Sequence, residues 1–278
     1  MGLIVYADFN DPACYLASQR IDELLERAVP VRWRAVEHER GLSLLGTATP
    51  ADQGRRAREL AEATRLALPG ELPAQAPPPV TTNTRAAVAA YAEAVADGVQ
   101  DEIRRRLFGA IWTGRQDLTS AYAVRRIITD VMYPRAPVGP RRCSSLPQPM
   151  TGDPDQAWAT RRLGGTIAPD GGPLTTAGML RLRAWREEWC ALGRPRLPVL
   201  IDADGTVHTA AAALRRLADL VTRARTGGVT TQPRRCTGPT PTSSRSAVAV
   251  PISLRPRSVS ARPTASSSPI SGTSVSPG

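Results

Sequence analysis

Asp11 and Cys14 are the side chains near the start of the sequence whose types and spacing suit proton transfer or thiol chemistry. They belong to the stretch Asp11-Pro12-Ala13-Cys14, which follows an apolar run at residues 3–9. Aspartate at an N-cap followed by proline at the first helical position is a typical helix start. Cys14 is therefore predicted in the first helical turn, where unpaired backbone N–H groups and the helix dipole favour a thiolate.

Each of these two residues also has a structural interpretation. A buried, isolated cysteine behaves as a small inert hydrophobe, and the carboxylate of Asp11, three residues before Cys14, disfavours a thiolate. Asp11 can act either as an N-cap or as a general base. The sequence leaves both alternatives open at both positions.

Charge and composition exclude several other classes of function. All 36 basic residues of the 278 are arginine, but seven of them follow residue 224 in a stretch without any acid. We therefore expect the folded part not to bind nucleic acid, and any such binding to involve the basic tail only. Four scattered cysteines and two distant histidines predict no disulfide framework and no metal site. No apolar run approaches a membrane span and no leader begins the chain, so we expect a cytoplasmic protein with no membrane partner.

The elements that must position Asp11 and Cys14 follow from periodicity. Residues 3–9 and 31–35 read as strands, and the latter alternates Val31, Trp33 and Ala35 with arginines. Helices are expected over residues 11–28, 51–68, 84–98, 99–112 and 117–132. A further helix over 175–192 carries an apolar stripe of Met179, Leu182, Trp185 and Trp189. Residues 197–202 and 206–208 then form a hairpin, closed by a helix over 210–223.

Residues 225–278 differ in composition from the rest of the chain. They are rich in serine, threonine, proline and arginine and almost free of aromatic residues. Such a segment cannot offset its chain entropy by burial, so we expect a disordered tail. The abrupt change in composition at this point is also what a decayed gene product would show. Residues 134–149 are predicted to form a loop because they are rich in proline, arginine and serine.

The opening motif resembles a known active site. Asp11-Pro12-Ala13-Cys14-Tyr15-Leu16-Ala17 is similar to the Cys-Pro-x-Cys-Tyr-Leu-Ala centre of the DsbA-like thioredoxin superfamily, and to the Ser-Pro-x-Ser-Tyr-Leu site of 2-hydroxychromene-2-carboxylate isomerases and kappa-class glutathione transferases. Asp11 stands where the first cysteine or serine is expected. Leu197-Pro198-Val199 resembles the cis-proline loop that faces the active-site helix, and Thr82-Asn83-Thr84 resembles a further motif of these relatives.

The resemblance implies an α/β fold, with a thioredoxin-like sheet in residues 1–224 and a helical insertion at about residues 50–165. It implies Asp11 and Cys14 as catalytic residues, and Pro12, Asn83, Leu197 and Pro198 as residues that bind substrate or cofactor. No tightly bound cofactor is expected, and the partner implied is a low-molecular-weight thiol or a thiol-containing substrate. The oligomeric state is unknown.

Two functions from different classes follow. One is an oxidoreductase-type protein of the DsbA family with a degenerate Asp-Pro-Ala-Cys centre. Cys14 alone cannot cycle between dithiol and disulfide, so the activity expected of it is that of a thiol-cofactor-dependent isomerase or transferase. The other is a non-catalytic binding or chaperone-like module on the same fold. His38 and Glu39, which follow the second strand, are predicted to lie in a solvated loop.

Overall fold

The computed structural model describes residues 2–132 and 167–227, all of which lie within one compact unit that spans residues 1–231. The predicted loop at 134–149, the last part of the predicted insertion and nearly all of the predicted tail lie outside the described residues.

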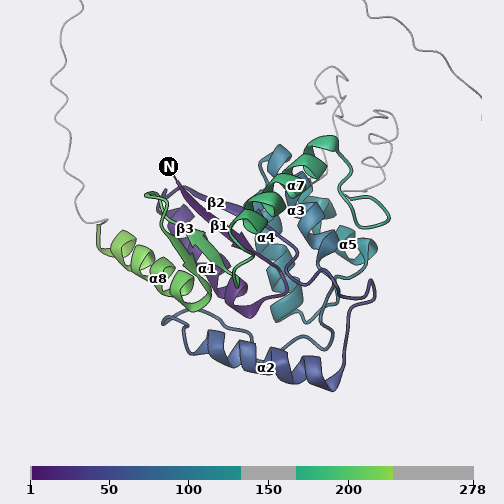
Figure 1. Ribbon diagram of the computed structural model, residues 1–278, viewed down its shortest axis with the longest axis horizontal. Coiled ribbons are helices and arrows are strands. Elements are labelled where there is room, and N and C mark those ends of the chain that lie inside the picture. The colour runs from purple at the N-terminus through teal and green to yellow at the C-terminus, as the bar shows by residue number, and fades with distance from the viewer. Residues whose placement is uncertain (1, 133–166, 228–278) are drawn as a thin grey trace, which may run out of the picture. The chain divides into compact units, whose positions relative to one another are not determined.

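A four-stranded sheet with the order β2-β1-β3-β4 forms the centre of the fold (Figure 1). Its strands are β1 (Leu3–Ala7), β2 (Val31–Ala35), β3 (Val199–Ile201) and β4 (Val207–Thr209). β1 pairs with β2 in parallel and with β3 in antiparallel orientation, so that Val5 lies opposite both Trp33 and Leu200. β4 pairs antiparallel to β3 as the predicted hairpin. The fold is thus a mixed sheet with helices around it, as the sequence predicts.

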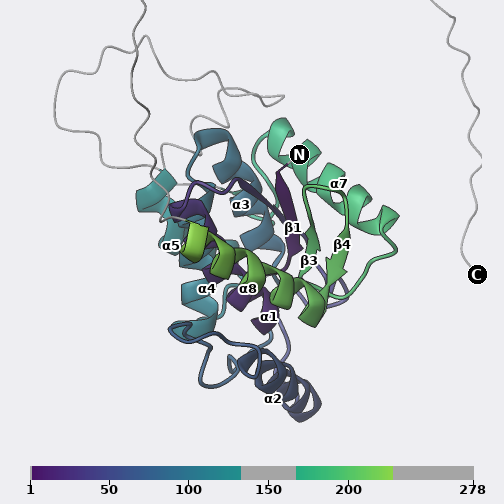
Figure 2. The same cartoon turned by 90° about the vertical axis from the view of Figure 1, so that its left-hand side faces the viewer.

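Two groups of helices cover the faces of the sheet (Figure 2). Helices α1 (Pro12–Glu26) and α8 (Ala210–Gly227) pack against each other, as do α3 (Arg85–Asp97) and α7 (Thr176–Ala191). Side chains alternate between the faces of a strand, and Tyr6 of β1 meets α7, where its hydroxyl donates to Glu188 Oε2 at 2.8 Å. The other α-helices within residues 2–132 are α2 (Pro50–Thr64), α4 (Gln100–Phe108) and α5 (Ala121–Met132).

Several features of the elements differ from the sequence expectation. The helix predicted over 99–112 is α4 followed by a π-helical turn, η1 (Gly109–Thr113). Met179 belongs to the predicted apolar stripe of α7 but is 56% exposed, because α7 packs on α3 through Gly178 and on the sheet side through Trp189. α8 continues to Gly227, and Arg225, placed in the tail by composition, forms an ion pair with Glu23 of α1.

Candidate functional site

Asp11 is the N-cap of α1. Its extended backbone precedes Pro12 at the first helical position, and its Oδ1 accepts hydrogen bonds from the backbone N–H of Ala13 at 2.7 Å and of Cys14 at 3.2 Å. The Asp-Pro pair therefore begins the helix as the sequence predicts. Both capping bonds use the same oxygen, which leaves Oδ2 outside the cap.

The Asp11 carboxyl group is poised to titrate near neutrality. Burial raises its pKa from 3.8 to about 6, outweighing the hydrogen bonds from the Cys14 and Ala13 N–H groups, which lower it. Glu59 raises the pKa further and Arg56 lowers it. A carboxylate of this pKa is ionised at neutral pH and can accept a proton from a bound molecule.

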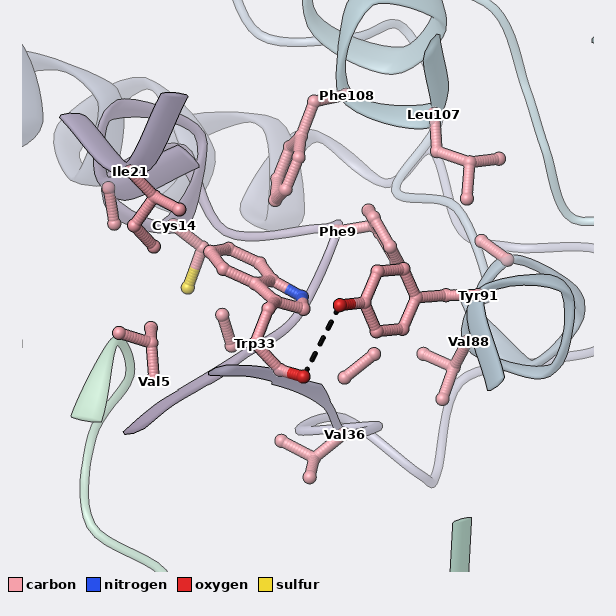
Figure 3. Packing of buried hydrophobic residues seen from close by; sticks show 14 of the residues in the cluster. Val5, Phe9, Cys14, Ile21, Trp33, Val36, Val88, Tyr91, Leu107 and Phe108 are labelled. Atoms are coloured by element: carbon pink, nitrogen blue, oxygen red, sulfur yellow. Dashed lines mark hydrogen bonds between the residues drawn. The ribbon is translucent and has the colours of Figure 1, made fainter. Parts of the chain in front are cut away.

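Cys14 lies behind the cap, in the hydrophobic core (Figure 3). Its side chain is fully buried, and burial raises the pKa of the thiol well above its ordinary value of 9.0. The neighbouring Asp11 charge raises the pKa further. The helix terminus predicted to favour a thiolate is present, but desolvation and the adjacent carboxylate outweigh it. Cys14 is a neutral thiol at physiological pH.

A small pocket of about 80 Å³ opens beside Asp11 and Pro12. It joins the start of α1 to the Leu197–Pro198 peptide bond, which is cis. The carbonyl oxygen of Pro198 accepts a hydrogen bond from the N–H of Ala210 at 2.8 Å, which connects this loop to the start of α8. The structure therefore brings Asp11, Pro12 and Leu197 together at one pocket. The residues that line it are Asp11, Pro12, Ala13, Glu59, Glu62, Ala63, Leu66, Arg196, Leu197, Ala210, Ala211 and Leu214.

Glu59 and Glu62 of α2 form a charged rim that sequence reasoning missed. Glu59 pairs with Arg56 at 3.2 Å, and Glu62 pairs with Arg196 at 3.1 Å. Their spacing of three residues places both on one helix face. This spacing is the sequence signal from which the pair could have been predicted. Because each has an arginine partner, Asp11 is the pocket carboxylate that makes no ion pair among the described residues.

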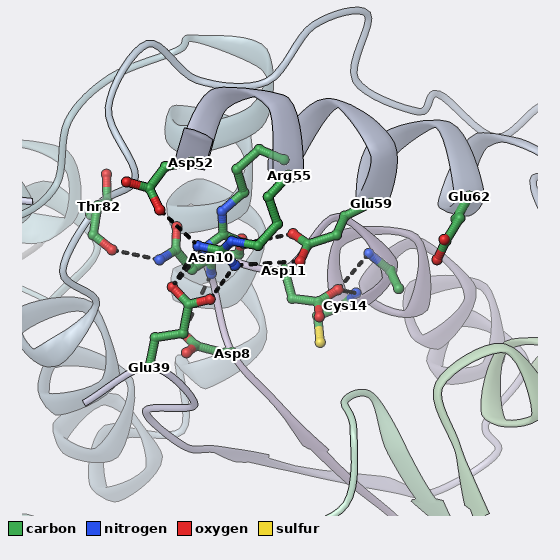
Figure 4. A network of polar contacts seen from close by, with 12 residues as sticks. Asp8, Asn10, Asp11, Cys14, Glu39, Asp52, Arg55, Glu59, Glu62 and Thr82 are labelled. Carbon is green, nitrogen blue, oxygen red and sulfur yellow. Dashed lines mark hydrogen bonds and ion pairs between the residues drawn. The ribbon is translucent and has the colours of Figure 1, made fainter. Parts of the chain in front are cut away.

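A polar network links this pocket to the loop that follows β2 (Figure 4). Buried Arg56 donates to the carbonyl oxygen of Asn10 at 2.7 Å and to Glu39 Oε2 at 3.0 Å. Glu39 also pairs with Arg55, so this residue is not in a solvated loop as predicted. Long-range pairing between a loop and α2 carries no local sequence signal. His38, by contrast, is exposed, and its backbone N–H donates to buried Asp8 at 2.7 Å.

Asn83 lies apart from the pocket. Its Nδ2 donates to the carbonyl oxygen of Leu42 at 3.1 Å, and its Oδ1 accepts from the N–H of Arg85 at 3.0 Å, at the start of α3. Asn83 therefore holds a loop and a helix start together, and the structure does not bring it to Asp11.

Two negative observations apply to residues 2–132 and 167–227. Within these ranges no group of three or more histidine, cysteine, aspartate or glutamate side chains is arranged to hold a metal ion. No helix within them is both long and apolar enough to cross a membrane.

Comparisons with known proteins found a matching family model and similar solved structures. Residues 2–133 match the family model of the DSBA-like thioredoxin domain, and no curated protein matches the sequence. The structure is similar to that of a probable DsbA oxidoreductase from Streptomyces coelicolor, with 13% identity and a TM-score of 0.50 over 81% of this chain and 90% of that chain. A protein provisionally classed as a disulfide isomerase from Nitrosomonas europaea shares 13% identity, with a TM-score of 0.42 over 80% and 98% of the two chains. Residues 2–133 are therefore similar to the DSBA-like thioredoxin domain, and the described residues have a DsbA-like thioredoxin fold.

Proposed function

We propose that the protein binds the thiol group of a small molecule in the pocket between Asp11 and the Leu197–Pro198 bond, and that Asp11 accepts the thiol proton. The reaction class is then thiol-dependent transfer or isomerisation. In this proposal Asp11 occupies the position of the nucleophilic cysteine of the related dithiol centres, and the attacking sulfur is supplied by the small molecule.

The observation that carries the proposal is the Asp11 carboxyl group itself. Its pKa of about 6 and its place in the lining of the pocket suit a general base at neutral pH. A two-thiol cycle has less support, because it requires two thiols that exchange with a substrate disulfide. Cys14 is fully buried, and burial holds its pKa high.

The chemical step balances without an oxidant. The thiol gives its proton to Asp11 while its sulfur forms a bond to an electrophilic carbon. In a transfer, the leaving group departs with the electrons of its broken bond. In an isomerisation, the sulfur adds to a conjugated double bond, the intermediate rotates, and elimination of the sulfur restores the double bond.

Binding of glutathione and of S-methylglutathione, measured by titration calorimetry, tests the thiol site. We expect wild type to bind glutathione about tenfold more tightly, because only the free thiol can donate to Asp11. Asp11→Asn keeps an oxygen for the helix cap but cannot take a proton, so it should lose this preference. Equal affinity for both compounds in wild type would contradict the proposal.

The buried state of Cys14 and the small pocket favour one second candidate, a non-catalytic binding module. Conjugation of glutathione to chlorodinitrobenzene separates the two. Turnover by wild type that falls with Asp11→Asn supports catalysis, whereas thiol binding without any turnover supports the binding module.

A further inference from the structure

Two cavities adjoin along α7, well apart from the residues of the Asp11 pocket. One has a volume of about 550 Å³ and the other about 650 Å³, and they share Glu37, Arg40 and Leu182. We call this continuous depression the α7 groove. None of its lining residues belongs to the pocket at Asp11, so it is a separate surface feature.

The length of the groove suits a chain segment. α7 lines it from Met179 to Cys190, eleven residues apart, which at a rise of 1.5 Å per residue spans about 16 Å. An extended peptide advances about 3.3 Å per residue. The groove therefore has the length of about five extended residues.

The groove combines an apolar floor with exposed apolar side chains. Val36, Val88 and Leu182 line its interior. At one end, Leu44 is 68% exposed and Met179 is 56% exposed. Large apolar side chains gathered at a groove mark interaction sites more often than isolated ones do. A partner with apolar side chains would bury them.

The charges around the groove favour an acidic partner. Arg40, Arg85, Arg183 and Arg186 line it, against Glu37 and Glu187.

Three of these arginines are already paired. Arg183 pairs with Glu187 at 2.7 Å, and Arg85 pairs with Asp170 at 3.0 Å. Arg40 pairs with Glu37 at the longer distance of 3.9 Å and its side chain is 48% exposed, so it can donate to a second carboxylate as well. Arg186 forms no ion pair within the described part of the chain and is the guanidinium group most available to a bound carboxylate.

We propose that the α7 groove binds an extended acidic peptide segment of a partner protein, about five residues long. Apolar side chains of the peptide pack on Leu182 and Met179, and its carboxylates approach Arg40 and Arg186. The arginine-rich stretch of this chain after residue 227 has the wrong charge for the groove, because it contains no acid. This binding does not depend on the chemistry proposed at Asp11.

A fluorescein-labelled peptide of alternating leucine and aspartate, followed by fluorescence anisotropy, tests the proposal on the full chain. We expect saturable binding that weakens as salt is added. Arg186→Glu and Arg40→Glu should each weaken binding about tenfold by placing like charges together. Arg215→Glu makes the same charge change on α8, at an exposed arginine that does not line the groove, and should leave affinity within about twofold.

Three outcomes would overturn the proposal. A peptide of alternating leucine and lysine that binds equally well would show that charge does not select the partner. Equal weakening by Arg215→Glu would show unspecific attraction to the basic protein. A dimer in sedimentation experiments that Met179→Ser dissociates would assign the groove to a second copy of the chain.

Discussion

At the scale of single residues, Asp11 holds two roles with opposite demands on its charge. As an N-cap it accepts two backbone hydrogen bonds, which favour the carboxylate. As a half-buried group beside Glu59 it resists ionisation. The resulting pKa of about 6, above the ordinary 3.8, means that the folded state holds the proton more tightly than the unfolded state.

This raised pKa predicts how the stability of the protein changes with pH. Because the folded pKa exceeds the unfolded one, stability is lost as pH rises from about 4 to about 6, by up to about 3 kcal/mol at 1.36 kcal/mol per pKa unit. Asp11→Asn retains the cap and has no charge to bury. It should therefore be more stable than wild type at pH 8, with a difference that vanishes near pH 4.

Urea unfolding of both proteins across this pH range measures the effect. Asp204→Asn is the control, since Asp204 is exposed and the N–H of Thr206 lowers its pKa. That substitution should not stabilise the protein at pH 8. An Asp11→Asn protein that is less stable than wild type at pH 8 would contradict the prediction.

The sequence identified Asp11 but not the state of Cys14. An Asp-Pro pair acts on the backbone next to it, so local chemistry is enough to predict the cap. The burial of Cys14 depends on residues from other elements, among them Ile21, Trp33 and Phe108 of the same core. Sequence reasoning therefore recognised both opposing influences on the thiol without being able to weigh them.

At the scale of elements, the contact of α7 with α3 depends on a glycine. Gly178 lies in the first turn of α7 beside buried Glu93, whose carboxylate accepts from the Thr175 N–H at 2.8 Å. A Cβ at position 178 would overlap Glu93 Oε1 and would lie 3.0 Å from the Pro173 Cβ. The Glu93 side chain cannot move away without giving up its hydrogen bonds to Thr175, which is the N-cap of α7.

Gly178→Ala should consequently destabilise the protein by about 2 kcal/mol, because the overlap exceeds the helix-propensity gain of about 1 kcal/mol. Gly54→Ala is the matched control in α2, where the Arg58 side chain at 3.8 Å is the nearest group. It should stabilise the protein by about 0.5 to 1 kcal/mol. Chemical denaturation measures both, and equal effects of the two substitutions would refute the packing argument.

Local sequence patterns predicted the helices and strands better than the long-range contacts between them. Alternation in residues 31–35 and the Asp-Gly turn at residues 204–205 correspond to β2 and to the β3–β4 hairpin. The π-helical turn η1 and the pairing of Glu39 with Arg56 were not predicted. Both depend on tertiary packing, which leaves no periodic signal in the chain.

At the scale of the whole molecule, α8 completes the core. Leu214, Leu217 and Val221 are fully buried, and the described residues belong to one compact unit. A chain ending at residue 231 should therefore keep the cooperative thermal transition of the full chain, whereas one ending at residue 209 should not fold. Circular dichroism melting of the three chains checks this. A 231-residue chain without a cooperative transition would mean that later residues belong to the domain.

The overall topology was predicted from the resemblance to the DsbA-like superfamily more than from the hydrophobic periodicity of the sequence. Periodicity gives strands and helices, but the placement of β3 between β1 and β4 follows from long-range packing. The order of motifs along the chain, from the Asp-Pro opening to the Leu197-Pro198 loop, supplied that information. The predicted tail and loop lie outside the described residues and stay predictions.

The buried guanidinium of Arg20 has a consequence for biosynthesis. It donates to the carbonyl oxygen of Leu214, a residue 194 positions later in the chain. At roughly 5 to 20 residues per second, a ribosome needs about 10 to 40 s to make that partner. During this interval the nascent chain holds a charged side chain that it cannot yet bury and a first strand whose antiparallel neighbour does not exist. Translation speed, rather than the closing of the sheet, therefore sets the earliest moment at which the native domain can form.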